Sequence, residues 1–319
     1  MTTLENLKTS TLAFGRRLMG TAAAAALGLG LGLAVIAGAP APVMAQDAAA
    51  QAGKPALWVL RDADSTIYLF GTVHLLRPET VWNSPVVDQA FNSADQIWFE
   101  IENPDDQAAA MPLIQRYGID METPLSSRLN ATEQSQLNTA AEAMGLTGPA
   151  FEPMRPWLAA LTLSMAPLTK AGYDPESGVE LVLRARALEA GKPIDGLETI
   201  EEQLQVLSGM SEDAQMAFLR SVLSDYENAT VELDRLVDAW AVGDVETLEE
   251  IGVTQMRAEG EEFYQNLLVK RNANWAGQID IMMDGEGVIF IAVGAAHLAG
   301  DDSVQALLEQ RGFTVERVQ

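Results

Sequence analysis

Short apolar runs near both ends of the chain predict β-strands, and a long stretch with helical features lies between them. The runs 58–60 and 67–70 flank the polar residues 61–65, an arrangement that predicts a β-hairpin. Residues 97–101 form another β-prone run. Residues 288–293 are continuously apolar, as is typical of a strand that is buried on both faces.

The region from about 105 to 280 is predominantly helical in character. The pair Asp174–Pro175 is typical of a capping residue followed by the first residue of a helix. Thr199 and Glu202 have the spacing of a capping box at the start of a further helix. Residues 193–197 predict a short strand between these two helices.

The C-terminal end returns to mixed structure. Residues 303–311 predict a helix that Gly312 ends, and residues 313–318 predict an edge strand. The order along the chain is therefore strands, helices, and then strand, helix, strand. It predicts an α/β fold with a mixed central sheet flanked by helices and a largely helical insertion in the middle of the chain. Residues 55–319 are expected to form this domain.

The beginning of the chain has the pattern of a signal peptide. A positively charged region precedes the apolar run 21–38, and Val43–Ala45 suits a signal-peptidase site. We therefore expect a signal peptide over 1–45, cleaved after about Ala45, a linker over 46–54, and a periplasmic or secreted mature protein without a membrane span. The alternative is an N-terminal membrane anchor, because the apolar run approaches the length that spans a bilayer.

Composition narrows the classes of partner and chemistry. The formal net charge of -25 repels nucleic acid and anionic lipid, so neither is expected as a partner of this acidic protein. The chain has no cysteine, which excludes disulfides, thiolate zinc sites, cysteine nucleophiles and a lipoprotein anchor. No Gly-x-Ser-x-Gly motif occurs, so the signature of a serine nucleophile elbow is missing.

Both histidines of the chain end the same short motif. His74 follows Gly71 and His297 follows Gly294, each at a distance of three residues and each after an apolar strand. A glycine at the end of a strand lets the chain turn sharply and lets another backbone approach closely. The imidazole then lies at the rim of the sheet, where open α/β sheets bind ligands. A single histidine would more often be structural, but the matched pair favours two metal ligands brought together by the fold.

Glu100 is the strongest carboxylate candidate because it ends an apolar strand. Two imidazoles and a carboxylate leave coordination positions open for water. Glu102 lies on the same face of the strand and is expected to be solvated. Glu180 and Glu198 are weaker candidates, each expected to bond to backbone at the start of a helix.

Several segments, in a fixed order, together resemble the TraB/GumN family. The resembling segments are 56–58 and 67–75 with the first Gly-x-x-His motif, Gly178–Glu180, Gly191–Pro193, Gly196–Thr199, Arg271–Asn272, Val293–Gly300 with the second motif, and Gly312–Val315. They extend over about residues 55 to 318.

The resemblance implies hydrolytic chemistry. Tiki proteins, which are distant relatives, are regarded as metal-dependent proteases that use two Gly-x-x-His motifs and a glutamate, and these roles correspond to His74, His297 and Glu100. Erythromycin esterases resemble a related branch, which extends the expected chemistry to esters. Gly71, Gly294, Glu180, Glu198 and Arg271 are expected to support the site.

The leading hypothesis is a metallohydrolase that acts outside the cytoplasm on a peptide or small ester. A manganese, cobalt or zinc ion would lower the pKa of a bound water. His74 and His297 would bind the metal or position the water, and Glu100 would bind the metal or act as general base. Two alternatives stay open: a non-catalytic periplasmic ligand-binding or accessory protein with the same pocket, and metal-free hydrolysis with His74 as general base.

Overall fold

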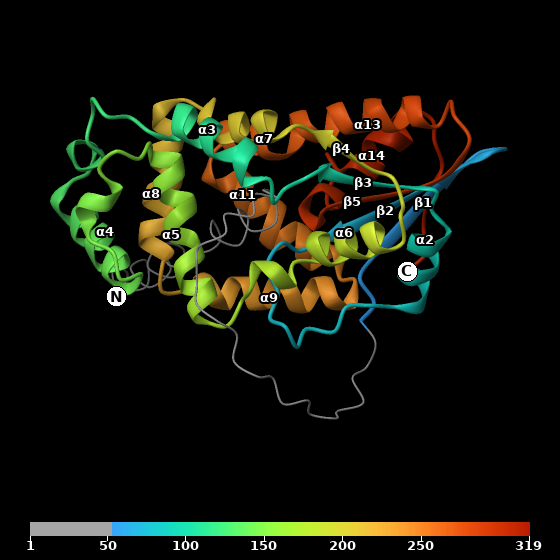
Figure 1. The fold of residues 1–319 in the computed structure, drawn as a ribbon, viewed down its shortest axis with the longest axis horizontal. Helices are drawn as coiled ribbons and strands as arrows, with labels where there is room; N and C mark the ends of the chain where they lie inside the picture. Colours follow the sequence, from blue (N-terminus) through green and yellow to red (C-terminus); the bar gives the residue numbers. More distant parts are fainter. Residues whose placement is uncertain (1–52) are drawn as a thin grey trace, which may run out of the picture.

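A six-stranded mixed sheet forms the centre of the computed structural model, which describes residues 53–319 (Figure 1). The strand order is β4-β3-β5-β2-β1-β6. The strands are β1 (Leu57–Arg61), β2 (Ser65–Thr72), β3 (Gln96–Ile101), β4 (Ile194–Glu198), β5 (Gly287–Gly294) and β6 (Val315–Arg317). Strands β2, β5, β3 and β4 are parallel, whereas β1 runs antiparallel to both β2 and β6. The predicted mixed sheet is confirmed.

The predicted strands all take part in this sheet. The hairpin is formed by β1 and β2, with Leu57 opposite Phe70 and Arg61 opposite Thr66. The predicted edge strand is β6, which is shorter than expected and pairs with β1 at one edge of the sheet. The predicted signal peptide and all but the last two residues of the predicted linker lie outside the described residues.

Helices connect the strands and make up most of the region between β3 and β5. They are α2 (Pro85–Ser93), α3 (Gln107–Gly118), α4 (Ala131–Ala143), α5 (Pro156–Lys170), α6 (Val179–Glu189), α7 (Ile200–Ser208), α8 (Glu212–Asp225), α9 (Ala229–Val242), α10 (Val245–Leu248), α11 (Gln255–Glu259), α12 (Glu261–Tyr264), α13 (Lys270–Met282) and α14 (Val304–Gln310). Two π-helical turns, Glu249–Thr254 and Gln265–Val269, lie before α11 and α13. As predicted, the helical region is interrupted by the short strand β4.

The two faces of the sheet are covered by different helices. Trp275 and Ile279 of α13, together with α14, pack against Leu69 and Ile291 on one face. On the other face, the rings of Phe91 in α2 and Phe290 in β5 meet edge to face at 5.5 Å. Figure 1 shows α13 and α14 on one side of the strands and α6 on the other. Strand β5 is therefore buried from both sides, which explains its continuous apolar run.

Local capping signals account for several helix boundaries. The predicted capping box is formed, since the Thr199 side chain accepts from the Glu202 N–H and the Glu202 carboxylate accepts from the Thr199 N–H. The prediction of a helix starting at Pro175 is wrong, because Pro175 opens a three-residue 3₁₀ turn. Helix α6 begins only at Val179, since Gly178 has a non-helical backbone conformation with ψ at 140°.

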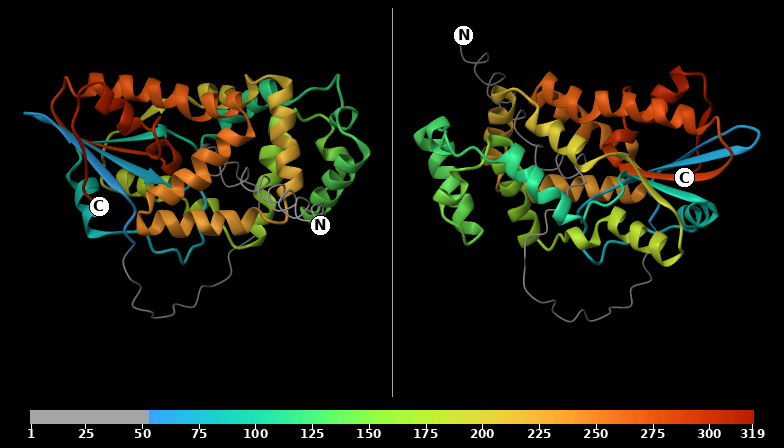
Figure 2. Two further views of the ribbon diagram at one scale, coloured as in Figure 1. Left: turned by 180° about the vertical axis from the view of Figure 1, so that it is seen from behind. Right: turned by 45° about the horizontal axis from the view of Figure 1, so that its top comes forward.

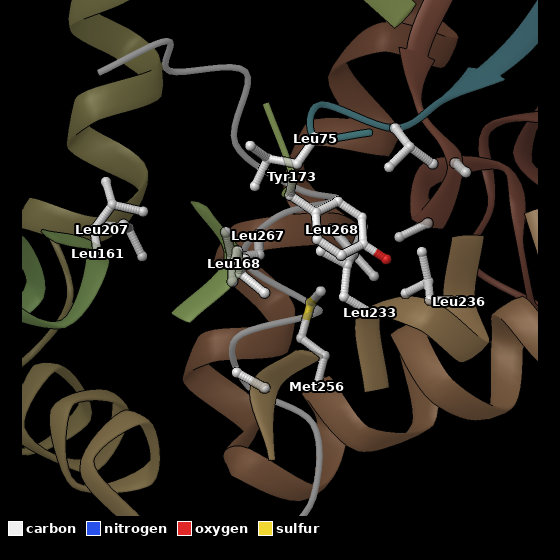
Figure 3. Close-up of a cluster of buried hydrophobic side chains, with 14 of the residues drawn as sticks. Leu75, Leu161, Leu168, Tyr173, Leu207, Leu233, Leu236, Met256, Leu267 and Leu268 are labelled. Atoms are coloured by element: carbon white, nitrogen blue, oxygen red, sulfur yellow. The ribbon is translucent and has the colours of Figure 1, made fainter. Parts of the chain in front are cut away.

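A helical lobe extends the molecule away from the sheet. Helices α5 and α8 pack together, and α4 lies beside them at the end opposite the β1–β2 hairpin (Figures 1 and 2). Apolar side chains join this lobe to the sheet end at which the histidines lie. Leu75, directly after His74, belongs to that cluster together with Tyr173 and Leu268 (Figure 3). Over residues 53–319, every helix is too short or too polar to cross a membrane.

Candidate functional site

The two Gly-x-x-His motifs lie side by side at the carboxyl ends of the inner strands β2 and β5. Strands β2 and β5 are parallel neighbours with Thr72 opposite Gly294, so both chains turn at the same level. A Cβ atom on Gly71 would lie 3.1 Å from the Cα of Ala295, which is closer than nearly all real contacts of this kind. The absence of a side chain at Gly71 therefore lets the backbone at Ala295 approach closely.

His74 is held by Glu180, the second residue of α6. The Nδ1 atom of His74 lies 2.8 Å from Oε1 of Glu180, and each side chain is 11% exposed. The hydroxyl of Thr72 donates a hydrogen bond to the same carboxylate oxygen. Gly178 makes this docking possible, because a Cβ there would lie 2.4 Å from the His74 carbonyl oxygen. The expectation that Glu180 serves mainly to bond backbone at a helix start is therefore replaced by pairing with His74.

The charges of this pair oppose the effect of burial. Burial alone would lower the pKa of His74, but the adjacent Glu180 carboxylate outweighs it and raises that pKa above 6.5. Burial would likewise raise the pKa of Glu180, but His74 and the Thr72 hydroxyl lower it below 4.5. The Nε2 atom of His74 is buried and has no hydrogen-bond partner among residues 53–319. One ring nitrogen is thus fixed by a carboxylate, and the other is buried without a partner among the described residues.

Arg271, in the first turn of α13, lies at the centre of a second cluster. Its Nη2 atom lies 2.8 Å from Oε2 of Glu100, and its Nε atom lies 2.9 Å from Oε1 of Glu198. Its Nη1 atom lies 3.0 Å from Nε2 of His297 and 3.3 Å from the carbonyl oxygen of Leu267. Arg271 and both carboxylate side chains are at most 5% exposed. The cluster is therefore a buried network of charged groups.

Both oxygens of each carboxylate in this network accept hydrogen bonds. Besides Arg271, Glu100 accepts from the Gln203 amide at 2.9 Å and from the Gly294 backbone N–H at 2.8 Å. Both oxygens of Glu198 accept from Arg271. The prediction that Glu198 bonds to backbone at a helix start is therefore wrong. Burial raises the pKa of Glu198 above 4.5, even though Arg271 acts in the opposite direction.

His297 is held in one tautomer. Its Nδ1 atom lies 2.5 Å from Oδ1 of Asn272, whose amide nitrogen donates to the Asp302 carbonyl oxygen at 2.7 Å. Since that Oδ1 only accepts, Nδ1 carries the proton and Nε2 presents its lone pair to Arg271. Burial, the Arg271 cation and the charge of His74 together hold the pKa of His297 well below 6.5. The ring, which packs 4.3 Å from the Trp275 ring between centroids, is therefore neutral.

The three residues predicted as a shared site lie at one end of the sheet, but they do not surround a vacant point. His297 and Glu100 approach each other, with Nε2 and Oε1 3.8 Å apart, and Arg271 contacts both. His74 is paired with Glu180 instead. Glu102, expected to be solvated, is exposed.

The same arrangement tests whether a divalent ion fits. The lone pair of His297 faces a guanidinium, and both oxygens of Glu100 accept hydrogen bonds. Within the described part of the chain, no group of three His, Asp or Glu side chains is placed to hold a metal ion. The side chains in this arrangement therefore do not fit a divalent ion.

Some residues of the site were not predicted as site residues from the sequence. Asn272 directly follows Arg271 in one of the family-like segments, and Thr72 lies inside the first Gly-x-x-His motif. Nothing in the chain points to Gln203 or Trp275, because both reach the site only through the packing of α7 and α13. The Oε1 atom of Gln203 is also buried without a hydrogen-bond partner among the residues described.

Comparisons with known proteins agree with the motif order. A model of the TraB/PrgY/gumN family matches residues 56–317. An uncharacterized protein of Treponema pallidum (strain Nichols) is 22% identical over 267 residues, which cover 80% of this chain and 80% of that protein. The uncharacterized protein YbaP of Escherichia coli (strain K12) is 22% identical over 256 residues, which cover 80% of this chain and 92% of that protein. No solved structure matches the chain significantly. The family match extends over nearly all described residues, and the chain therefore belongs to the TraB/PrgY/gumN family.

Proposed function

We propose that this protein is a hydrolase that acts outside the cytoplasm on a peptide or small ester, with His74 and Glu180 as its catalytic dyad. The observation that carries the proposal is the asymmetry of the His74 ring. Its Nδ1 atom is held by a buried carboxylate, while its Nε2 atom is buried and has no partner in the described part of the chain. A base whose second nitrogen is oriented by a carboxylate is a recurring arrangement for activating a nucleophile.

The chemistry follows from the tautomer that Glu180 imposes. In neutral His74 the proton lies on Nδ1, beside Oε1 of Glu180, and the lone pair lies on Nε2. Nε2 takes a proton from a water molecule while the water oxygen attacks the carbonyl carbon of the substrate. When the tetrahedral intermediate collapses, Nε2 returns that proton to the departing alkoxide or amine. The products are a carboxylic acid and an alcohol or amine, and the dyad returns to its initial state.

The raised pKa of His74 suits this role. A general base works best when its pKa lies near the working pH, because it is then both available and strong. Burial acts to lower the pKa of His74, but the Glu180 carboxylate outweighs it and raises that pKa above 6.5, which makes the ring a stronger base. His297, whose pKa lies well below 6.5, would be a much weaker base.

A binding or accessory protein is the second candidate, because the Arg271 cluster resembles a structural network. Its guanidinium, carboxylates and imidazole satisfy one another without a ligand. This alternative predicts a pocket that binds without turnover.

A substrate screen tests the proposal. The purified protein is assayed with p-nitrophenyl esters of graded acyl length and with fluorogenic peptides, and His74→Gln is compared with Glu189→Gln. Glu189 lies exposed at the end of α6, so its substitution changes the same helix without touching the dyad. We expect His74→Gln to reduce the rate by about 10²–10⁴-fold, the usual contribution of a general base. Full activity in folded His74→Gln would refute the dyad, and tight binding without turnover would favour the binding protein. Sequencing of the exported protein tests the proposed location and should begin near Gln46.

A further inference from the structure

The position where the sequence predicted a metal ion is the position of an arginine. We infer that Arg271 is the permanent cation of this site: its guanidinium organises Glu100, Glu198 and His297 as a divalent ion would, so the folded protein takes up no such ion there. This inference rests on the proposed function, because it concerns the same site, but its test measures metal binding and does not depend on turnover.

The donors of Arg271 all face acceptors of the protein. A guanidinium has five N–H bonds, and each of those of Arg271 can be matched to an acceptor. Nε donates to Glu198, Nη2 donates to Glu198 and Glu100, and Nη1 faces His297 and the Leu267 carbonyl. A metal ion bound between these groups would have to displace the guanidinium from them.

Arg271 carries a buried charge that two buried carboxylates balance. Arg271 is 4% exposed, and buried charges persist only when they are paired. Burial acts to lower the pKa of Arg271, but Glu100 and Glu198 outweigh it and raise that pKa above its ordinary value. Unlike a lysine, an arginine cannot leave its partners by losing a proton, so the cluster keeps its cation at any working pH.

Contacts other than ion pairs also hold the Arg271 side chain in place. The π-helical turn Gln265–Val269 leads directly into α13 and supplies the Leu267 carbonyl that contacts Nη1. From the other side, the guanidinium carbon lies 4.7 Å from the centroid of the Trp275 ring. Backbone and aromatic ring therefore fix the guanidinium in addition to its ion pairs, and moving it aside would break all of these contacts together.

These contacts make Arg271 a positioning residue. Its donors are matched to protein acceptors. It pairs with Glu100, which also accepts from the Gly294 N–H at the end of β5, and its Nη1 atom contacts the lone pair of His297. Removing the guanidinium would leave two carboxylates and one imidazole around a vacancy. That set of oxygen and nitrogen ligands is suited to zinc or cobalt.

Cobalt titration tests the inference, because Co²⁺ gives visible ligand-field bands when protein side chains bind it. We expect no bands in the wild-type protein or in Arg271→Lys, which keeps the positive charge. Arg271→Ala should bind a single Co²⁺ per chain, and Arg271→Ala/His297→Gln should lose the bands. Circular dichroism establishes that each variant is folded.

Two results would overturn the inference. One is a folded Arg271→Ala that binds no Co²⁺. The other is a wild-type protein that binds Co²⁺, Mn²⁺ or Zn²⁺ in equilibrium dialysis and loses this binding in His297→Gln. The wild-type dialysis decides the matter if Arg271→Ala does not fold. Failure of the dyad would instead appear as activity in His74→Gln, so the two proposals fail by separate observations.

Discussion

Glu180→Gln should lower the pKa of His74 while nearly preserving the shape of the site. In the wild-type protein the carboxylate lies 2.8 Å from Nδ1, and both groups are buried. Two unit charges about 4 Å apart in an effective dielectric of about 20 attract by about 4 kcal/mol. Burial opposes this attraction and would lower the pKa of His74 if it acted alone. With glutamine in place of glutamate, burial is the larger remaining influence, so the pKa should fall below 6.5.

Nuclear magnetic resonance can follow this change directly, because the chain has only two histidines. In the wild-type protein one ring should titrate above pH 6.5, and the other should stay neutral well below it. In Glu180→Gln the first midpoint should move to lower pH, whereas Glu189→Gln on the exposed end of α6 should leave it unchanged. An unchanged His74 midpoint in Glu180→Gln would show that the carboxylate does not set the protonation of the ring.

The same variant should change stability within a defined pH window. The raised pKa of His74 contributes stability that is fully present below the unfolded value of 6.5 and is lost as pH rises through the folded pKa. The lowered pKa of Glu180 contributes stability that is present above 4.5 and is lost as pH falls through its folded pKa. Denaturation by urea should therefore show the largest loss in Glu180→Gln between pH 4.5 and 6.5.

Two further predictions concern the backbone and the second histidine. Gly178→Ala should destabilise the protein by about 1–3 kcal/mol in urea denaturation, because its Cβ would lie 2.4 Å from the His74 carbonyl oxygen. Gly277→Ala is the control, since the nearest atom to its Cβ is a flexible Arg311 nitrogen at 3.6 Å; equal losses in both would contradict the argument. The lowered pKa of His297 predicts that wild-type stability declines as pH falls below 6.5, by up to about 1.4 kcal/mol per pH unit. His297→Gln should remove this decline, and an equally steep decline in the variant would show that another group causes it.

Local patterns were sufficient to predict most of the sheet. Apolar runs bounded by turn residues identified the hairpin and the buried strand β5, and the capping box identified the start of α7. Helix α2 was not predicted, although Ser84 caps it and Pro85 occupies its first position. These two residues are a recognisable start signal, so the information was present in the sequence.

The site was predicted only where its residues share a local motif. The matched Gly-x-x-His motifs identified His74 and His297, and at Gly71 the close approach of Ala295 gives a physical reason for the glycine. The pairing of Glu180 with His74 depends on the docking of α6 against the loop after β2, where the Val179 N–H donates to the Val73 carbonyl oxygen. Such contacts between distant segments leave no periodic pattern in the chain.

The charge beside each ring distinguishes two histidines that the sequence motif makes equivalent. His74 lies next to a carboxylate, and this neighbour raises its pKa in spite of burial. His297 lies next to a guanidinium, and this neighbour adds to the effect of burial and lowers its pKa. His74 is therefore the stronger base of the two, whereas His297 stays neutral and serves as an acceptor for Arg271. The two rings therefore differ in basicity, and this difference supports the proposed assignment of proton transfer to His74 and not to His297.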